Sequence, residues 1–547
     1  QIRQRWQELS GLPERTPTEI EAKRKQFRQF STSQDAYLLQ QIAAIPIAQF
    51  YQPKTLDNKH CVITEQNYRD YLTGRLTVPA GQATASAWAI ADRKKFFHWF
   101  LEFPEIMQGG GFDCILGNPP YLGNRRLKGT YGASFLEWVC FEYKPAGSVD
   151  LAVYFLRRMF ELISESGFIS LITTNTIAQG GARVGGLEYA LNNEGTINFA
   201  AKSIRWPGLA AVNVSLLSLY KGKWSGQFNL DGKSVERITS LLDDGESDLK
   251  PSPLVANSDR SFVGSYVLGK GFMLDIEEGE KLHKTEGGSK VVFPYLNGKD
   301  LNNSPEQKAS RLILNFRNLA EDQARELSPD CFSIIEERVK PDRTRLKENG
   351  DFALRKPLPQ RWWMYADKRP ALYRTISDLE RVLVIAQVSK TTAFTFVPKG
   401  QVYDAMLIVF PFEGAEYLAV MQSNFHTQWA WRYCTTMKTD LRYGPSVIFE
   451  PFPFPELSSD LARVGECYYE HRKATMLLLW LGLTKIYNLF HDPDLSPELV
   501  AKVSGKPADI AQQGYSALLK LRELHLEMDT AVRDAYGWTD LNLSHGF

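Results

Sequence analysis

The chain has 547 residues, of which 44% are hydrophobic and 23% are charged, and its formal net charge is +1 at pH 7. This length predicts roughly three or four domains with sizeable cores, and the near-neutral charge is no argument for nucleic acid. No apolar run reaches membrane-spanning length, and the six cysteines form no CxxC pair or zinc-like cluster. We therefore expect a cytoplasmic protein with reduced thiols, no metal and no membrane partner.

The first segment, residues 1–95, has the composition of charged helices. Apolar residues recur at helical spacing from Ala36 to Phe50, and the segment shows little sign of chemistry. We expect it to be a helical arm or an insertion ahead of a catalytic domain. Residues 96–105 follow as an aromatic run that turns acidic, which is typical of a core strand with an acidic end.

The most informative stretch runs from Phe112 to Tyr121. Residues 112–116 are apolar except for Asp113 and predict a short buried strand, and Gly117 lets the backbone bend or approach a ligand. Two prolines follow, and each fixes φ and removes an N–H donor. The turn therefore offers carbonyl oxygens, the Asn118 amide and an aromatic ring. These groups suit gripping a planar molecule that carries an amino group.

This stretch resembles the Asn-Pro-Pro-Tyr signature of DNA methyltransferases that modify an amino group. The resemblance implies that the Asn118 side-chain oxygen and the Pro119 carbonyl accept hydrogen bonds from the amine of a flipped base, on which Tyr121 stacks. Two acceptors are needed because the lone pair of adenine N6 is delocalised into the ring and must point at an incoming methyl group. The alternative is an ordinary Pro-Pro turn, but the strand that precedes it favours the functional interpretation.

The next segments follow the family's order of motifs. Residues 148–165 have helical spacing with Ser148 as the expected N-cap, and residues 168–175 predict the next buried strand. Trp206 and a proline then precede another strand-like run, residues 212–220. By resemblance, Trp206 covers the flipped base from the face opposite Tyr121, and the alternative is a Trp packed under a loop.

The resemblance also implies S-adenosylmethionine as the methyl donor. Glu102 and Phe103 match the acidic–aromatic pair that contacts the donor's adenine in this family, and Pro120 is assigned to the same cofactor-binding group. A carboxylate can accept from the adenine amine, and a ring can pack on the purine face. No strand–glycine–helix block for the methionine end stands before residue 96. We therefore expect a fragment of a larger protein, with the main cofactor motif upstream.

Local charge suggests nucleic acid more than the net charge does. From Arg338 to Arg374 there are eleven Lys or Arg residues against four Asp or Glu residues, with Trp and Tyr interleaved. Cations suit phosphate contacts, and aromatic residues suit entry into a groove. We expect Arg355, Lys356 and Arg361 to bind double-stranded DNA. The alternative is a solvated charged loop.

Short apolar runs between turn-rich connections continue to about residue 456. Near the end of this region, residues 435–455 resemble the recognition-domain end of Type IIG restriction–methylation enzymes and of methylases from phage-defence operons such as DISARM. The resemblance implies DNA contacts for Lys438, Arg442 and Tyr443. Residues 457–547 predict helices, with an amphipathic stretch at 518–528 that packs on the recognition domain.

The predicted fold is α/β, with a Rossmann-like methyltransferase half on a mixed, mostly parallel sheet, a mixed α+β target-recognition domain and helical flanking regions. The expected parts are the arm, the catalytic half, the recognition domain and the helical C-terminal region, at residues 1–95, 96–224, 225–456 and 457–547.

The predicted function is site-specific methylation of adenine N6, in the gamma order of motifs, within a restriction–modification or phage-defence system. Other subunits of a defence complex are possible partners. Two alternatives stay open: a non-catalytic DNA-recognition subunit, and the methylase part of a fused restriction endonuclease, although the sequence has no convincing nuclease signature. Methylation of RNA or protein is a weaker third option.

Overall fold

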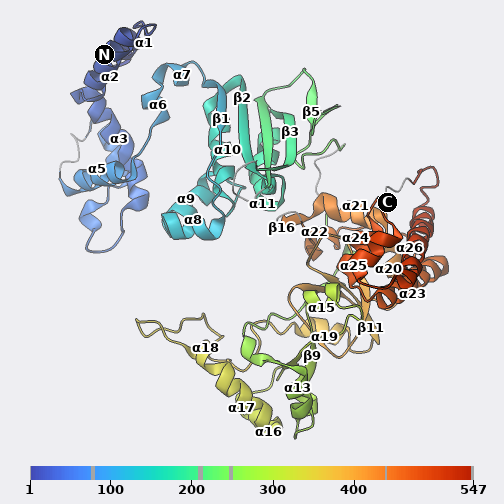
Figure 1. Ribbon diagram of the computed structural model, residues 1–547. Coiled ribbons are helices and arrows are strands. Elements are labelled where there is room, and N and C mark those ends of the chain that lie inside the picture. The colour runs from blue at the N-terminus through green and yellow to red at the C-terminus, as the bar shows by residue number, and fades with distance from the viewer. Residues whose placement is uncertain (1, 76–80, 207–212, 246–250, 438–439, 544–547) are drawn as a thin grey trace. The chain divides into compact units, whose positions relative to one another are not determined.

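The protein is described by a computed structural model that covers residues 2–75, 81–206, 213–245, 251–437 and 440–543. The chain divides into two compact units, Gln1–Leu249 and Lys250–Phe547 (Figure 1). None of the helices in these described ranges is both long and apolar enough to cross a membrane.

The first unit begins with a group of helices, as predicted for residues 1–95. Thr16 and Glu19 form a reciprocal capping box at the start of the second helix, and Ser33 caps the third. The helices are α1 (Ile2–Ser10), α2 (Pro17–Ser31), α3 (Gln34–Tyr51), α4 (Glu65–Leu72) and α5 (Gln82–Lys94). A small core joins α3 and α5 through Ile45, Ala48, Ala87 and Ile90.

The strand predicted for residues 96–105 is wrong, because this stretch forms two short helices, α6 (Trp99–Glu102) and α7 (Pro104–Gln108). Pro104 begins the second of them, a position where a missing N–H costs nothing. Phe103 between them packs on Trp99 and Phe112, with ring centroids 5.9 and 5.2 Å away. These aromatic residues thus pack on one another from helices rather than in a sheet, and Phe97, Phe100 and Phe103 remain exposed.

A six-stranded sheet follows, in the order β1-β2-β4-β3-β5-β6. Among the described residues, two of its five pairings are parallel, β1 with β2 and β3 with β5. The sheet is mixed, as predicted, but the expectation that it is mostly parallel is wrong, since β3 and β4 pair antiparallel and need no helical crossover. The strands are β1 (Phe112–Gly117), β2 (Ile163–Thr174), β3 (Gly195–Arg205), β4 (Asn213–Lys221), β5 (Phe228–Leu230) and β6 (Lys233–Val235).

Strands β5 and β6 extend this sheet past residue 224, the predicted end of the catalytic half. Helix α10 (Leu151–Leu162) packs against β2 and is capped by Asp150 rather than by the predicted Ser148. The other helices of this unit are α8 (Asn124–Tyr131), α9 (Ala133–Glu142), α11 (Gly180–Arg183) and α12 (Tyr189–Asn192). Their shared core includes Leu156, Ile169 and Leu217.

Strand β1 lies at the edge of the described sheet and pairs with β2 alone. Asp113, Cys114 and Leu116 are exposed, and Leu116 retains 76% of its accessible surface. The prediction of a buried strand is therefore wrong for the described part of the chain, because one side of β1 has no neighbour there. Gly117 is needed for packing, since a Cβ there would lie 2.6 Å from Cε of Met159.

The second unit contains two four-stranded sheets and a three-stranded one, in the orders β14-β9-β10-β8, β13-β11-β15-β7 and β12-β17-β16. The predicted strand at 382–386 is confirmed as part of β11 (Arg381–Ala386). The other strands are β7 (Phe262–Val263), β8 (Met273–Leu274), β9 (Val292–Leu296), β10 (Leu312–Leu314), β12 (Val388–Ser389), β13 (Thr395–Pro398), β14 (Val402–Tyr403), β15 (Leu407–Phe410), β16 (Thr435–Met437) and β17 (Asp440–Arg442).

Between these strands lie α13 (Ile276–His283), α14 (Gly288–Val291), α15 (Gly298–Asn303), α16 (Glu321–Leu327), α17 (Pro329–Arg338), α18 (Lys340–Thr344), α19 (Pro370–Thr375), α20 (Ala415–Gln422), α21 (Asn424–Tyr433) and α22 (Pro445–Ile448). The predicted C-terminal helices are α23 (Ser459–Leu479), α24 (Leu483–Phe490), α25 (Pro497–Ser504) and α26 (Ala508–Ala535). Figure 1 shows α23 and α26 side by side. Buried Arg472 on α23 donates to the Phe394 carbonyl at 2.6 Å, which ties the helices to the strands.

Candidate active site

The Asn-Pro-Pro-Tyr turn lies at the carboxyl end of β1. Because β1 and β2 are parallel and Gly117 pairs with Leu171, the carboxyl ends of both strands meet at one edge of the sheet. In open α/β sheets this edge is where ligands bind. The turn is therefore beside the residues that leave β2, Thr174 and Asn175.

The Tyr121 hydroxyl links the two strand ends. It lies 2.7 Å from Oδ1 of Asn118 and 3.0 Å from the carbonyl oxygen of Ile172, and its single hydrogen can be donated to only one of them at a time. Asn118 is exposed, whereas Pro119 is buried. The turn thus presents an accessible carboxamide on a rigid, partly buried base.

Asp150 lies close enough to Tyr121 for its charge to act on the Tyr121 hydroxyl. It accepts a hydrogen bond from the Ala152 amide at 3.0 Å, and burial raises the pKa of its carboxyl group. Burial and then the charge of Asp150 raise the pKa of Tyr121. Tyr121 is therefore a neutral phenol that can donate a hydrogen bond at physiological pH.

Asn175 is the centre of a second hydrogen-bond network. The sequence analysis identified this residue only as the end of a strand. Its Nδ2 donates to Oγ of Ser203 at 2.8 Å, while its Oδ1 accepts from the Ser203 amide at 3.2 Å and from Oγ of Ser215 at 2.8 Å. Ser203 has a left-handed backbone, with φ of 56°. The position of Asn175 at the end of a predicted strand could have revealed it, but the conformation of Ser203 has no sequence signal.

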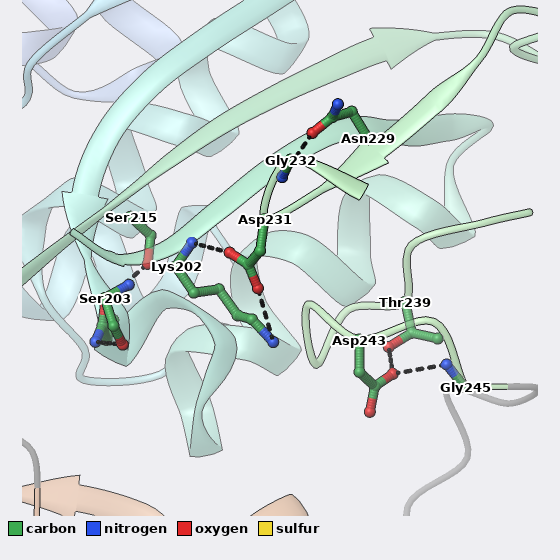
Figure 2. Close-up of polar contacts among 10 residues, drawn as sticks. Lys202, Ser203, Ser215, Asn229, Asp231, Gly232, Thr239, Asp243 and Gly245 are labelled. Carbon is green, nitrogen blue, oxygen red and sulfur yellow. Dashed lines mark hydrogen bonds and ion pairs between the residues drawn. The ribbon is translucent and has the colours of Figure 1, made fainter. Parts of the chain in front are cut away.

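The end of β3 is held from the opposite side as well. Figure 2 shows Lys202 reaching Asp231 both with its amide, 2.7 Å from Oδ1, and with Nζ, 3.7 Å from Oδ2. Trp206, the predicted second stacking residue, directly follows β3 and is half buried. The proline after it lies outside the described residues. The two sets of contacts around residues 202 and 203 fix where the chain leaves β3 toward Trp206.

The predicted cofactor residues Glu102 and Phe103 lie elsewhere. Phe103 packs on Phe112, at the amino end of β1. A strand rises about 3.3 Å per residue, so the length of β1 separates this contact from the turn by roughly 16 Å. Pro120 is exposed in the turn itself. The cofactor role of these three residues stays a prediction, and the position of Glu102 and Phe103 does not favour it.

The described residues do not fit a complete site for S-adenosylmethionine. Those that precede β1 form helices and connecting loops without a strand, so no strand–glycine–helix cradle stands ahead of the turn among them. They also hold no group of three side chains that could bind a metal ion. What the geometry provides is an exposed carboxamide beside an aromatic ring at the end of β1, and we assign no step to the donor.

Four of the predicted DNA-binding residues are exposed in the second unit: Arg355, Lys356, Arg361 and Arg442. Lys438 lies outside the described residues. Tyr443 is fully buried, and its hydroxyl lies 2.9 Å from Nε2 of His426. The prediction that Tyr443 contacts DNA is wrong because a hydrophobic cluster encloses its ring.

The aromatic residues interleaved in the basic stretch are core residues too. Trp362, Trp363 and Tyr365 are buried, and the last two donate to the carbonyl oxygens of Leu319 and Leu314 at 3.0 and 2.7 Å. The expectation that these rings suit entry into a groove is therefore wrong, whereas Arg355, Lys356 and Arg361 of the same stretch are exposed.

Two family models match this chain, one within each of its two compact units. Residues 40–200 match the family model described as Eco57I restriction-modification methylase, and residues 257–456 match the model described as MmeI, target recognition domain. The chain thus joins a segment that matches a restriction-modification methylase model to a segment that matches a target recognition model. The resemblance to restriction–modification methylases inferred from the Asn-Pro-Pro-Tyr turn is confirmed, and that turn lies in the methylase segment.

Two individual proteins are similar over most of this chain. DNA methyltransferase A of Bacillus subtilis (strain 168) is 24% identical over 452 residues, which are 76% of this chain and 48% of that protein. The Type IIL restriction-modification enzyme MmeI, solved in complex with DNA, superposes with a TM-score of 0.60 at 17% identity, covering 84% of this chain and 62% of that one. The likeness to MmeI shows a shared fold. The chain spans about half the length of the curated relative, 48%.

Proposed function

We propose that this chain is the base-holding and target-recognition part of a site-specific DNA methyltransferase, which transfers a methyl group from S-adenosylmethionine to N6 of a flipped adenine. The observation that carries the proposal is the placement of Asn118. It lies exposed at the carboxyl end of β1, in a Pro-Pro turn tied through Tyr121 to the end of β2. A restriction–modification or phage-defence system is the proposed setting, with other subunits of a defence complex as further partners.

The base side of the reaction is a matter of hydrogen bonding and orientation. Oδ1 of Asn118 and the carbonyl of Pro119 accept the two N–H bonds of the amine, which turns its lone pair away from the ring plane. Tyr121 and Trp206 supply rings for stacking on the extruded base. Because the amine is held in one orientation, methyl transfer does not depend on a random encounter of the two reactants. Positioning therefore supplies most of the rate enhancement.

The second unit is proposed to bind double-stranded DNA through its exposed cations Arg355, Lys356, Arg361 and Arg442. None of the four has a buried position that would keep it from a phosphate. Contacts of this kind provide affinity and position the protein on the duplex, whereas base contacts select the site.

The test is methyl incorporation into DNA by the complete protein with added S-adenosylmethionine, comparing wild type with Asn118→Ala. We expect the variant to lose methyl transfer while it keeps its affinity for duplex DNA, because Asn118 is exposed and supports no core. Nucleoside analysis of the product distinguishes the bases: label in N4-methylcytosine would overturn the adenine assignment.

One observation favours a second candidate, a non-catalytic recognition subunit: the described residues provide no donor cradle ahead of β1. Tight duplex binding by the complete protein without methyl transfer would support that role. It would also predict that Asn118→Ala changes neither binding nor any other property of the complex.

A further inference from the structure

A cavity of about 550 Å³ opens in the second unit, beside β9 and β14. Four separate segments line it: β9, the turn after β10, α19 with the loop before it, and the turn between β13 and β14. This volume is in the range of sites for small molecules or for single groups of a larger ligand.

The cavity is strongly cationic. Arg317, Lys368, Arg374 and Lys399 line it, and no carboxylate is among the described residues that line it. Lys399 pairs with Glu380 at 3.2 Å. The other three have no ion pair within the described residues. Like charges gathered in one hollow repel each other, and bound anions relieve that repulsion.

The backbone holds one of these cations in an unusual conformation. Arg317 has a left-handed φ of 54°, and Oδ1 of Asn315 accepts a hydrogen bond from its amide at 2.9 Å. Its guanidinium lies over the ring of Phe293, 5.2 Å from the centroid. A non-glycine residue in this region carries strain, and such strain is concentrated at functional sites.

The neighbours of the other cations also leave them free for a ligand. Asp367 forms its ion pair with Arg369 at 3.2 Å, and its charge only partly offsets the effects that lower the pKa of Lys368. Burial and then the charge of Arg361 lower the pKa of Lys368, which a bound anion would reverse. The Tyr373 hydroxyl is engaged with Oγ of Ser265 at 2.9 Å, which fixes one wall of the cavity.

We propose that this cavity is a phosphate-binding site, which receives a phosphate group of the nucleic-acid backbone and is gripped by Arg317, Lys368 and Arg374. The choice of the backbone as the source of the phosphate rests on the proposed function. The cations converge from segments that are distant in the sequence, and guanidinium groups match the geometry of a phosphate with two parallel hydrogen bonds. The site is distinct from the predicted Arg355, Lys356 and Arg361.

The test uses the whole chain and a duplex of arbitrary sequence, because a phosphate contact does not depend on sequence. Affinity is measured across a salt series for wild type, Arg317→Gln and Arg374→Gln. Lys502→Gln is the matched control, since Lys502 is an exposed cation on α25 that does not line the cavity. We expect each cavity variant to reduce the slope of log K against log salt by about one unit and the control to leave it unchanged.

A second arm identifies the source of the phosphate by calorimetry with inorganic phosphate. Binding to wild type that both cavity variants abolish, with unchanged duplex slopes, supports the phosphate site and assigns it to a free phosphate group. Variants that match Lys502→Gln in both arms overturn the inference while duplex binding, and with it the proposed function, stands. If wild type binds no duplex, the proposed recognition role fails, and the calorimetry still decides whether the cavity binds phosphate.

Discussion

The Tyr121 hydroxyl lies 2.7 Å from the side-chain oxygen of Asn118. This contact engages the atom to which we assign the first hydrogen bond from the substrate amine. A carboxamide oxygen has two lone pairs, so the contact leaves one acceptor position open. The hydroxyl therefore orients the carboxamide, with its oxygen fixed at the strand end.

Removing only this hydroxyl should slow methyl transfer modestly. We expect Tyr121→Phe to keep duplex affinity and to lower the transfer rate about fivefold, the equivalent of one hydrogen bond of roughly 1 kcal/mol. Tyr121→Ala, which also lacks the ring, should lose more, since stacking on a base contributes about 1–3 kcal/mol. Single-turnover rates check both. A faster Tyr121→Phe enzyme would mean that the hydroxyl competes with the substrate for Asn118.

The Asn175 network should matter for stability more than the hydroxyl of Ser203 does. In Asn175→Ala the buried hydroxyl of Ser215 and the Ser203 amide lose their shared acceptor, so we expect a loss of about 1–3 kcal/mol in the free energy of unfolding. Ser203→Gly gives up one hydrogen bond but relieves a left-handed backbone, which costs a non-glycine residue roughly 1–2 kcal/mol.

Ser203→Gly should therefore be near neutral in urea unfolding, and it is the control for Asn175→Ala. If Ser203→Gly is as damaging as Asn175→Ala, the stabilising element is the Ser203 side chain, and our account of the network is incorrect.

The fully buried His426 should make stability depend on pH. Burial lowers its pKa to about 3. As the pH falls below about 6.5, the imidazole therefore binds a proton in the unfolded chain but stays neutral in the folded chain. Stability from this residue is complete above pH 6.5 and is lost as the pH falls toward 3.

Between pH 7 and pH 5 the loss should be about 2 kcal/mol. The measurement is urea unfolding of wild type and His426→Asn at both pH values, in which the titration of other groups cancels. The advantage of wild type over the variant should shrink at pH 5. An advantage that is constant, or that grows, would show that the imidazole is protonated in the folded state.

Much of the first unit could be predicted from local sequence signals. Short apolar runs before turn residues identified β1 and β2, and helical spacing identified α10, because these patterns are written in neighbouring residues. The aromatic run at 96–103 was misread, since a half-buried strand and a packed helix use the same residue types. Its real signal was Pro104, which suits the first position of a helix.

The features that the sequence could not reveal depend on distant residues. Arg317, Lys368 and Lys399 meet around one cavity although more than 80 residues separate the first from the last. The exposure of β1 depends on which strands are its neighbours. The same holds for Ser203, whose left-handed backbone is stabilised by Asn175 from another strand end.

Arg442 and Tyr443 are neighbours in sequence with opposite environments, and they allow a direct test of the interface. Arg442 is exposed, whereas Tyr443 is fully buried against His426. Arg442→Gln should weaken duplex binding and reduce its salt slope by about one unit, with no change in melting temperature. Tyr443→Phe should leave duplex binding unchanged and lower the melting temperature. The ring still fills its place, but Nε2 of His426 loses its only described partner, which lowers the free energy of unfolding by about 1–3 kcal/mol. Salt-dependent binding and thermal unfolding of both variants check the pair. Weakened binding by a fully stable Tyr443→Phe would show that the hydroxyl becomes accessible to DNA, and the assignment of Tyr443 to the core would then fail.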